Sequence, residues 1–127
     1  MINTSVAELQ KYFVKSFQEK GIKYSTNRAE NLPFPYLKLW ELNSWSEECK
    51  TFNEDYVRFT WWFWDYDKNT KNTLTTIQQI HEIAKGASSE VSGIVFVDKE
   101  KEAIRDAQKP DSKCTVIVYK FKLYGGK

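Results

Sequence analysis

The fold of this chain is decided by the stretch YVRFTWWFW at residues 56–64. Alternate residues of a β-strand point to opposite faces of a sheet, and large apolar side chains fill both sets here. We therefore predict a strand over 55–66. Because both of its faces are largely aromatic, we do not expect the second face to be solvated. The first set is Val57, Phe59, Trp61 and Phe63, and the second is Tyr56, Arg58, Thr60, Trp62, Trp64 and Tyr66.

Upstream of this strand, the sequence predicts a helix and a connector. Apolar residues recur at helical spacing over 5–20, and Gly21 supplies the left-handed residue that ends a helix. Pro33 and Pro35 disfavour regular structure, so 23–35 is predicted to be a connector.

A second strand is predicted over 36–45, followed by a polar stretch at 43–54 that we expect to be a loop between two strands. In the second strand, period-two alternation divides the side chains between two faces. We assign Leu37 and Leu39 to one face, and Tyr36, Lys38, Trp40 and Leu42 to the other.

Downstream, a turn at 67–69 leads to a helix over 71–85 that Gly86 is expected to end. Strands are predicted over 91–97 and 113–124. The highly charged stretch between them, 98–112, is expected to extend these strands as a long, partly mobile hairpin arm.

The resulting order, α-β-β-α-β-β, predicts an α+β fold. We expect a mostly antiparallel four-stranded sheet, with two helices packed on one face and a long charged hairpin arm. Residues 1–127 are expected to form a single domain, which suits the length of the chain.

The charge of the chain is nearly balanced, with 19 Lys and Arg against 17 Asp and Glu, a formal net charge of +2. This balance is unlike that of a protein that binds nucleic acid by bulk electrostatics. No apolar run approaches the roughly 20 residues that span a bilayer, and the first residues lack the features of a signal peptide. We therefore expect a chain that has no membrane contact and stays in the cytoplasm where it is made.

The residues that could carry catalysis are few. His81 lies within a predicted helix beside an apolar stripe, so we interpret it as structural. Cys49 and Cys114 are too few and too widely spaced for a disulfide framework or a metal motif. No glycine-rich loop is placed to hold a phosphate. We therefore expect a protein that is not an enzyme, with no catalytic residue, metal or cofactor.

A binding module for single-stranded nucleic acid remains an alternative. Arg58, Trp62, Trp64 and Tyr66 alternate on one strand face, and aromatic rings on a sheet can stack unpaired bases. Acidic residues flank these rings and the basic residues do not gather there, which favours a core or a protein interface instead.

The order and local character of the elements resemble a known family. An N-terminal helix leads to FPYLKL at 34–39, then to the aromatic strand at 56–64, DYDKN at 65–69, a helix with Ile77, Ile80 and Ile83, and VIVYKF at 116–121. Over about residues 5–124, this is similar to the small tail-completion proteins of long-tailed bacteriophages and prophages. These are also called tail terminators or head-tail joining proteins.

The resemblance implies a structural role in virion assembly. Members of that family form a ring, usually hexameric, on the head-proximal end of the tail tube. The ring stops tube polymerisation and offers a surface to the head connector protein. The implied partners are other copies of the chain, the tail tube protein and the head connector, with DNA passing through the channel transiently. The implied location is the virion tail or neck, assembled in the bacterial host cytoplasm. Another neck or minor tail component is the nearest alternative.

A ring of this kind joins two different patches on neighbouring subunits. We expect the aromatic strand face to form one patch and the charged arm to reach across to a neighbour. The candidate interface residues are Arg58, Trp62, Trp64, Tyr66, Lys99, Lys101, Arg105 and Lys109.

Overall fold

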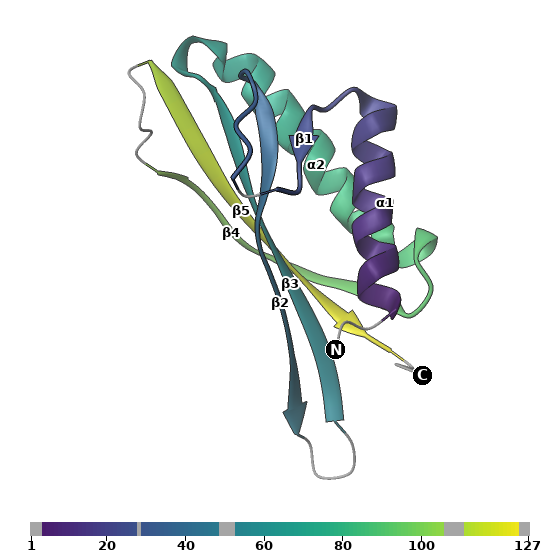
Figure 1. Cartoon of the computed structure of the whole chain (residues 1–127). Coiled ribbons are helices and arrows are strands. Elements are labelled where there is room, and N and C mark those ends of the chain that lie inside the picture. Colours follow the sequence, from purple (N-terminus) through teal and green to yellow (C-terminus); the bar gives the residue numbers. More distant parts are fainter. Residues whose placement is uncertain (1–3, 28, 49–52, 106–110, 125–127) are drawn as a thin grey trace.

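The chain folds into a five-stranded sheet with two helices on one of its faces (Figure 1). The structure is a computed structural model that describes residues 4–27, 29–48, 53–105 and 111–124. Its elements are α1 (Thr4–Lys20), β1 (Tyr24–Ser25), β2 (Tyr36–Glu48), β3 (Asn53–Tyr66), a 3-10 turn (Asp67–Asn69), α2 (Thr70–Glu90), β4 (Ile94–Arg105) and β5 (Ser112–Leu123). The strand order is β1-β2-β3-β5-β4, and every pair is antiparallel except β1 with β2.

The α+β class and the two helices on one face of the sheet are confirmed. The core lies between the helices and one face of β3 and β5. Phe13 of α1 packs against the rings of Phe59 and Trp61, with ring centroids 5.2 and 5.4 Å apart. Trp61 is fully buried, as the alternation of β3 requires when one face meets both helices.

The predicted end of the first helix is confirmed. Gly21 has φ +71°, and the backbone N–H of Ile22 donates to the carbonyl of Phe17 at 2.8 Å. This closure satisfies a carbonyl at the helix end, and the left-handed conformation favours glycine.

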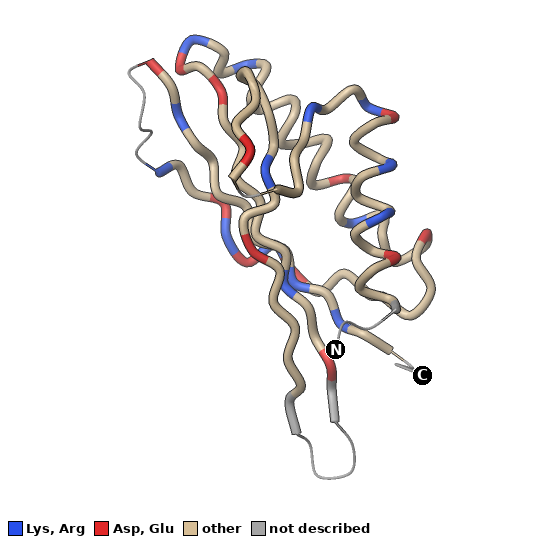
Figure 2. Tube along the Cα trace, viewed as in Figure 1, with Lys and Arg blue, Asp and Glu red and all other residues tan. Residues whose placement is uncertain are grey.

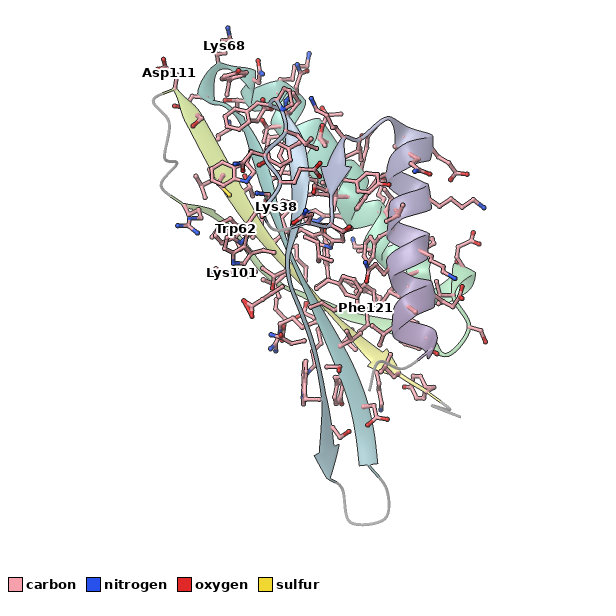
Figure 3. The ribbon with its side chains drawn as sticks, viewed as in Figure 1. Lys38, Trp62, Lys68, Lys101, Asp111 and Phe121 are labelled. Atoms are coloured by element: carbon pink, nitrogen blue, oxygen red, sulfur yellow. The ribbon has the colours of Figure 1, made fainter. Side chains whose placement is uncertain are left out.

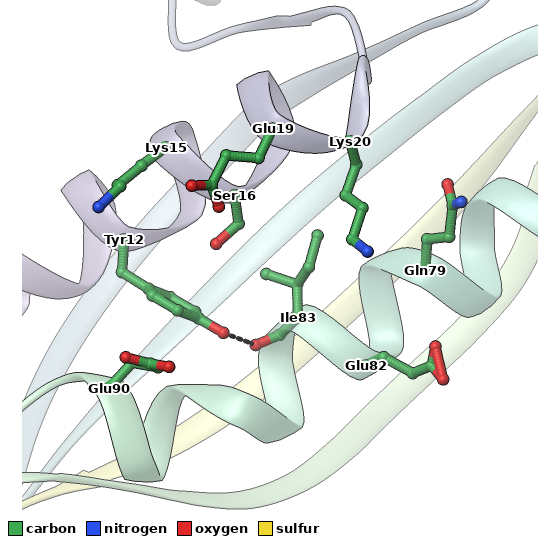
Figure 4. A pocket seen from close by; sticks show the side chains of 9 residues that line it. All are labelled: Tyr12, Lys15, Ser16, Glu19, Lys20, Gln79, Glu82, Ile83 and Glu90. Atoms are coloured by element: carbon green, nitrogen blue, oxygen red, sulfur yellow. Dashed lines mark hydrogen bonds between the residues drawn. The ribbon is translucent and has the colours of Figure 1, made fainter.

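The predicted end of the second helix is wrong, because α2 continues through Gly86 to Glu90. The hydroxyl of Tyr12 donates to the carbonyl of Ile83 at 2.6 Å, across the groove between the helices (Figure 4). A Cβ added at Gly86 would lie 3.0 Å from that hydroxyl oxygen. Gly86 therefore permits the close approach of α1 and does not end α2.

The sheet contains one strand more than the four predicted. The two-residue strand β1, inside the predicted connector, pairs in parallel with Leu37 and Lys38 of β2. So short a strand carries no sequence periodicity that would reveal it.

The predicted loop at 43–54 is also wrong for most of its length. β2 continues to Glu48 and β3 begins at Asn53, so these residues form a long hairpin that extends past the helices (Figure 1). Both faces of this extension lie away from the core, so its side chains are polar without preventing strand pairing. Ser46 of β2, for example, donates to the Asp55 carboxylate of β3 at 2.5 Å.

A bulge in β2 changes the faces predicted for that strand. The pairing with β3 shifts between Leu39 and Glu41, and one extra residue reverses the alternation beyond that point. As a result Leu42 pairs with Phe59 and lies on the helix-facing side, not on the side predicted.

The charged stretch extends the flanking strands as predicted, because residues 98–105 belong to β4 and pair with β5. β4 starts at Ile94 rather than at 91. As an edge strand it carries charges that discourage uncontrolled pairing with other chains. Figure 2 shows acidic and basic positions alternating along its middle. The remainder of the predicted arm, 106–110, lies outside the described residues. Within the described parts of the chain, neither helix has the length and apolar character needed to cross a membrane.

Candidate assembly surface

The face of the sheet that lies away from the helices is rich in aromatic side chains, and we call it the outer face. In Figure 3, Trp62 and Lys101 lie on this side, whereas Phe121 points toward α1. From the sequence we expected this face to be covered. Within the described ranges, however, no helix packs over its centre, and Trp62 stays partly exposed. The aromatic residues of the outer face are Phe34, Tyr36, Trp40, Trp45, Tyr56, Trp62, Trp64 and Tyr66.

Trp62 lies at the centre of this face between two flat groups. The ring of Trp40 stacks on it with centroids 3.7 Å apart and planes 8° from parallel. The Arg105 guanidinium carbon lies 4.3 Å from the Trp62 ring centroid, so a cation–π contact is formed as well. These contacts hold the indole in one orientation before any partner arrives, which reduces the entropy lost on binding.

A second cluster follows toward the hairpin. The rings of Trp45 and Tyr56 stack with centroids 5.5 Å apart. The Arg58 guanidinium carbon lies 4.6 Å from the Trp45 ring, and the Lys120 Nζ lies 4.4 Å from the Tyr56 ring. Each ring of this cluster therefore has a cation beside it.

Arg58 also forms a two-point contact across β5 with Glu100 of β4. Its Nε donates to Oε1 at 2.5 Å and its Nη2 donates to Oε2 at 3.2 Å. The hydrogen bonds raise the pKa of Arg58 and lower the pKa of Glu100. Both groups thus stay charged, and the forked geometry fixes Arg58 beside the aromatic cluster.

The opposite end of the outer face is covered by the connector. Phe34 stacks on Trp64, with centroids 6.1 Å apart and planes 9° from parallel, and meets Tyr66 edge-on at 5.2 Å. Below it Lys38 is only 4% exposed, and its Nζ donates to Asn31 at 3.2 Å. Trp64 therefore packs against the connector, whereas Trp62 packs between Trp40 and Arg105, and both side chains are partly exposed.

Most residues of the predicted interface come together on the outer face. Arg58, Trp62, Trp64 and Tyr66 alternate along β3 on that side. Lys101 and Arg105 of β4 line a shallow depression beside Trp62 and Val116. Four further residues of the outer face were not predicted to belong to the interface: Trp40, Trp45, Tyr56 and Lys120. Alternation along β2, β3 and β5 places Trp40, Tyr56 and Lys120 on this face, whereas Trp45 reaches it only through the bulge between Leu39 and Glu41.

Lys99 does not lie on the outer face with the other predicted interface residues, and Lys109 lies outside the described residues. Lys99 pairs with Tyr119 on the helix-facing side, and its Nζ lies 3.0 Å from the Glu102 carboxylate. The pairing of β4 shifts between Lys99 and Lys101, so the two lysines lie on opposite faces of the sheet.

Lys99 belongs to a polar cluster between α2 and β4. Both ring nitrogens of His81 have protein partners, the hydroxyl of Tyr119 and the Glu102 carboxylate, the latter at 2.7 Å. Hydrogen bonds from Lys99 and then His81 lower the pKa of Glu102, whereas burial raises the pKa of Tyr119. With Tyr119 only 1% exposed, this cluster ties α2 to the sheet.

In the part of the chain that the structure describes, few side chains are placed to bind a metal ion or to act as a nucleophile. There, no three His, Cys, Asp or Glu side chains are grouped so that they could hold a metal ion. Cys114 lies fully buried, and burial raises its pKa to about 12, which keeps the thiol protonated and unreactive at neutral pH.

Comparison with known proteins gives a structural likeness alone. No protein-family model matches the chain, and no curated protein matches it. A chain in the solved virion of a native gene transfer agent particle has a similar fold, with a TM-score of 0.50 and 13% sequence identity. The match covers 97% of this chain and 96% of that chain, so the likeness extends over the whole of both.

Proposed function

We propose that this protein is a structural component of a phage-like virion. More specifically, it is a tail-completion protein that caps the tail tube as a ring, ends tube polymerisation and provides the surface that joins tail to head. Its partners are further copies of itself, the tail tube protein and the head connector, and DNA passes the ring transiently. The proposal assigns no reaction to the chain, and no cofactor.

The observation that carries the proposal is the outer face, a preformed aromatic and cationic surface without a helical cover. Trp, Tyr and Arg are the residues that most often dominate the energy of protein interfaces. Here they are ordered by their own contacts, as in the Trp40–Trp62–Arg105 stack. The fold shared with a chain of a virion particle supports the same assignment.

Electron microscopy of particles from a strain that lacks the gene tests the proposal. A tail-completion protein predicts overlong tube polymers and heads without tails, because nothing ends polymerisation or joins the two parts. Tails of normal length that attach to heads would contradict the assignment. Particles with complete tails but leaking or unfilled heads would point to another neck component instead.

A second candidate function is binding of single-stranded nucleic acid. The observation that favours it is the pairing of rings with cations, Arg105 over Trp62 and Arg58 over Trp45, which is also how bases and phosphates are bound together. Fluorescence titration with an oligothymidine at several salt concentrations tests it. Binding that weakens steeply with salt and is lost in Trp62→Ala would favour this function.

A further inference from the structure

The sheet has two open edges that differ in chemistry. β4 forms one edge of the strand order. At the other edge β1 covers only Leu37 and Lys38 of β2, and among the described residues no strand pairs with the remainder of β2 on that side. An open edge presents unpaired backbone donors and acceptors, which a strand of another chain can satisfy.

The strand directions permit these two edges to meet. From β2 through β3 and β5 to β4 every neighbour is antiparallel, so β4 runs opposite to β2. A second copy placed beside the first, with its helices on the same face, would therefore bring its β2 antiparallel to β4. Neighbouring strands therefore remain antiparallel across the boundary between the two copies.

The charges on the outer side of the two edges are complementary. Lys101 makes no ion pair within the described ranges, whereas the neighbouring glutamates of β4 are held by Arg58 and by His81 and Lys99. The outer side of the β4 edge thus presents Lys101 and Arg105, with Asp98 further along the strand. Beyond Lys38, the outer side of β2 presents Glu41. Glu41 lies on the same cross-sheet row as Lys101, through Thr60 and Val118.

The helix-facing side of the β4 edge is apolar and uncovered. Ile104 is 71% exposed and Leu74 of α2 is 59% exposed. They flank a groove of about 360 Å³ that Ile77 and Thr115 also line. Ile104 shares its cross-sheet row with Leu37 through Thr115 and Phe63, and the edge of Leu37 is paired with Tyr24 of β1. In the register that puts Glu41 opposite Lys101, the β1–β2 end of the next copy would therefore lie beside this groove.

We propose that the β4 edge of one copy pairs with the β2 edge of the next, so that identical chains join head to tail into one continuous antiparallel sheet. The contact is heterologous, and its repetition gives the ring of the proposed function when the rotation between neighbouring copies closes. The outer faces of successive copies then form an unbroken aromatic band, which stays available to another virion protein. This inference deepens the proposed function by assigning the contact between subunits.

Cysteine crosslinking tests the pairing. In a background with Cys49→Ser and Cys114→Ala, single cysteines replace Glu41 or Asn43 on β2, and Lys101 or Ala103 on β4. All four positions lie on the outer face, so the four β2–β4 mixtures also cover a shift of the register by two residues. We expect disulfide-linked dimers in at least one mixture, and none in any variant oxidised alone. Lys11→Cys on α1, where the side chain is 76% exposed, mixed with Glu41→Cys controls for random collision.

The mixtures are oxidised in concentrated solution and again in particles assembled from the variants. Absence of dimers in both settings would overturn the pairing, as would dimers of Lys101→Cys alone, which would indicate that two β4 edges meet. In the mixture of Asn43→Cys with Ala103→Cys, Glu41→Lys added to the first chain is expected to abolish the dimers, and Lys101→Glu added to the second to restore them. Completed tails without crosslinks would refute the pairing but not the virion role. Crosslinks, together with normal tails in the strain that lacks the gene, would refute the role but not the pairing.

Discussion

At the scale of single residues, Trp61 and Trp62 are neighbours in sequence but differ in what surrounds them. Trp61 is fully buried under the rings of Phe13 and Phe17. Trp62 lies on the outer face between Trp40 and Arg105. Under the proposed function, Trp61 therefore serves the stability of the fold and Trp62 serves assembly.

This contrast predicts different effects of alanine at the two positions. Trp61→Ala is expected to lower the free energy of unfolding by about 3–5 kcal/mol, because it leaves a cavity in the core. Trp62→Ala is expected to cost about 1–2 kcal/mol, chiefly the lost stacking and cation–π contacts. Urea unfolding of both variants measures these values. Equal losses would contradict the division between the two faces.

Gly86 provides a second prediction at this scale. Alanine in a helix interior is about 1 kcal/mol more favourable than glycine. Gly86→Ala is nevertheless expected to give no gain in stability, because its Cβ would lie 3.0 Å from the Tyr12 hydroxyl oxygen. In a Tyr12→Phe background the same change should stabilise by about 1 kcal/mol. Thermal unfolding of the four chains tests this, and a gain of equal size in both backgrounds would show that the hydroxyl is irrelevant.

The Arg58–Glu100 pair predicts a dependence of stability on pH. The pKa of Glu100 is lowered from 4.5 in the folded chain, chiefly by the hydrogen bond from Arg58. The folded state therefore binds this proton less readily than the unfolded state does. The stabilisation is complete above the ordinary pKa and is lost as the pH falls through the lowered one.

Wild type should consequently lose more unfolding free energy between pH 7 and pH 3 than Glu100→Gln does, by less than about 1 kcal/mol since the pair is partly exposed. Denaturation at both pH values measures the difference, and Arg58→Met serves as the matched variant of the partner. Identical losses in wild type and Glu100→Gln would mean that the pair does not contribute.

At the scale of elements, the sequence predicted those parts whose residues repeat with a clear period. β3, β5 and α1 alternate or recur as their burial requires, and the structure confirms them. The parts that were missed have local causes that periodicity does not register. A two-residue strand has no period, and polar residues pair in the projecting hairpin because the core does not reach them.

The face on which each candidate interface residue lies was likewise predicted where the alternation is regular and missed where it is interrupted. Trp62 and Arg58 follow the alternation of β3 directly. Lys99 does not follow that of β4, because the shifts of pairing before Asp98 and before Lys101 reverse the face. A bulge depends on how two whole strands pair with each other, so no single residue of the sequence predicts it.

The junction of β3 and α2 supports another prediction. Asp65 is 1% exposed, and its carboxylate accepts hydrogen bonds from the Tyr66 N–H at 2.7 Å, Asn69 Nδ2 at 2.9 Å and Thr73 Oγ1 at 2.6 Å. Asp65→Ala is expected to destabilise the fold by about 2–4 kcal/mol, because it leaves these buried donors without their charged acceptor. In a double-mutant cycle Thr73→Val should cost much less once Asp65 is gone. Strictly additive losses, measured by urea unfolding, would contradict a coupled junction.

At the scale of the whole molecule, the two faces of the sheet have separate roles. The helices cover one face and supply the core, so the opposite face is free to carry rings and cations that the fold does not need for burial. The two edge strands also differ from each other: β4 and β2 differ in charge and run in opposite directions. We propose that the edges contact other copies of the chain and that the outer face contacts a different protein.

The central claim, that the chain completes tails through its outer face, is tested most directly by electron microscopy of tails. A strain that lacks the gene is supplied with wild type, with Trp62→Ala, or with Lys11→Ala as a control on exposed α1. We predict tails of normal length with wild type and Lys11→Ala, and overlong tubes with Trp62→Ala although that variant remains folded. Normal tails with a folded Trp62→Ala protein would contradict the account.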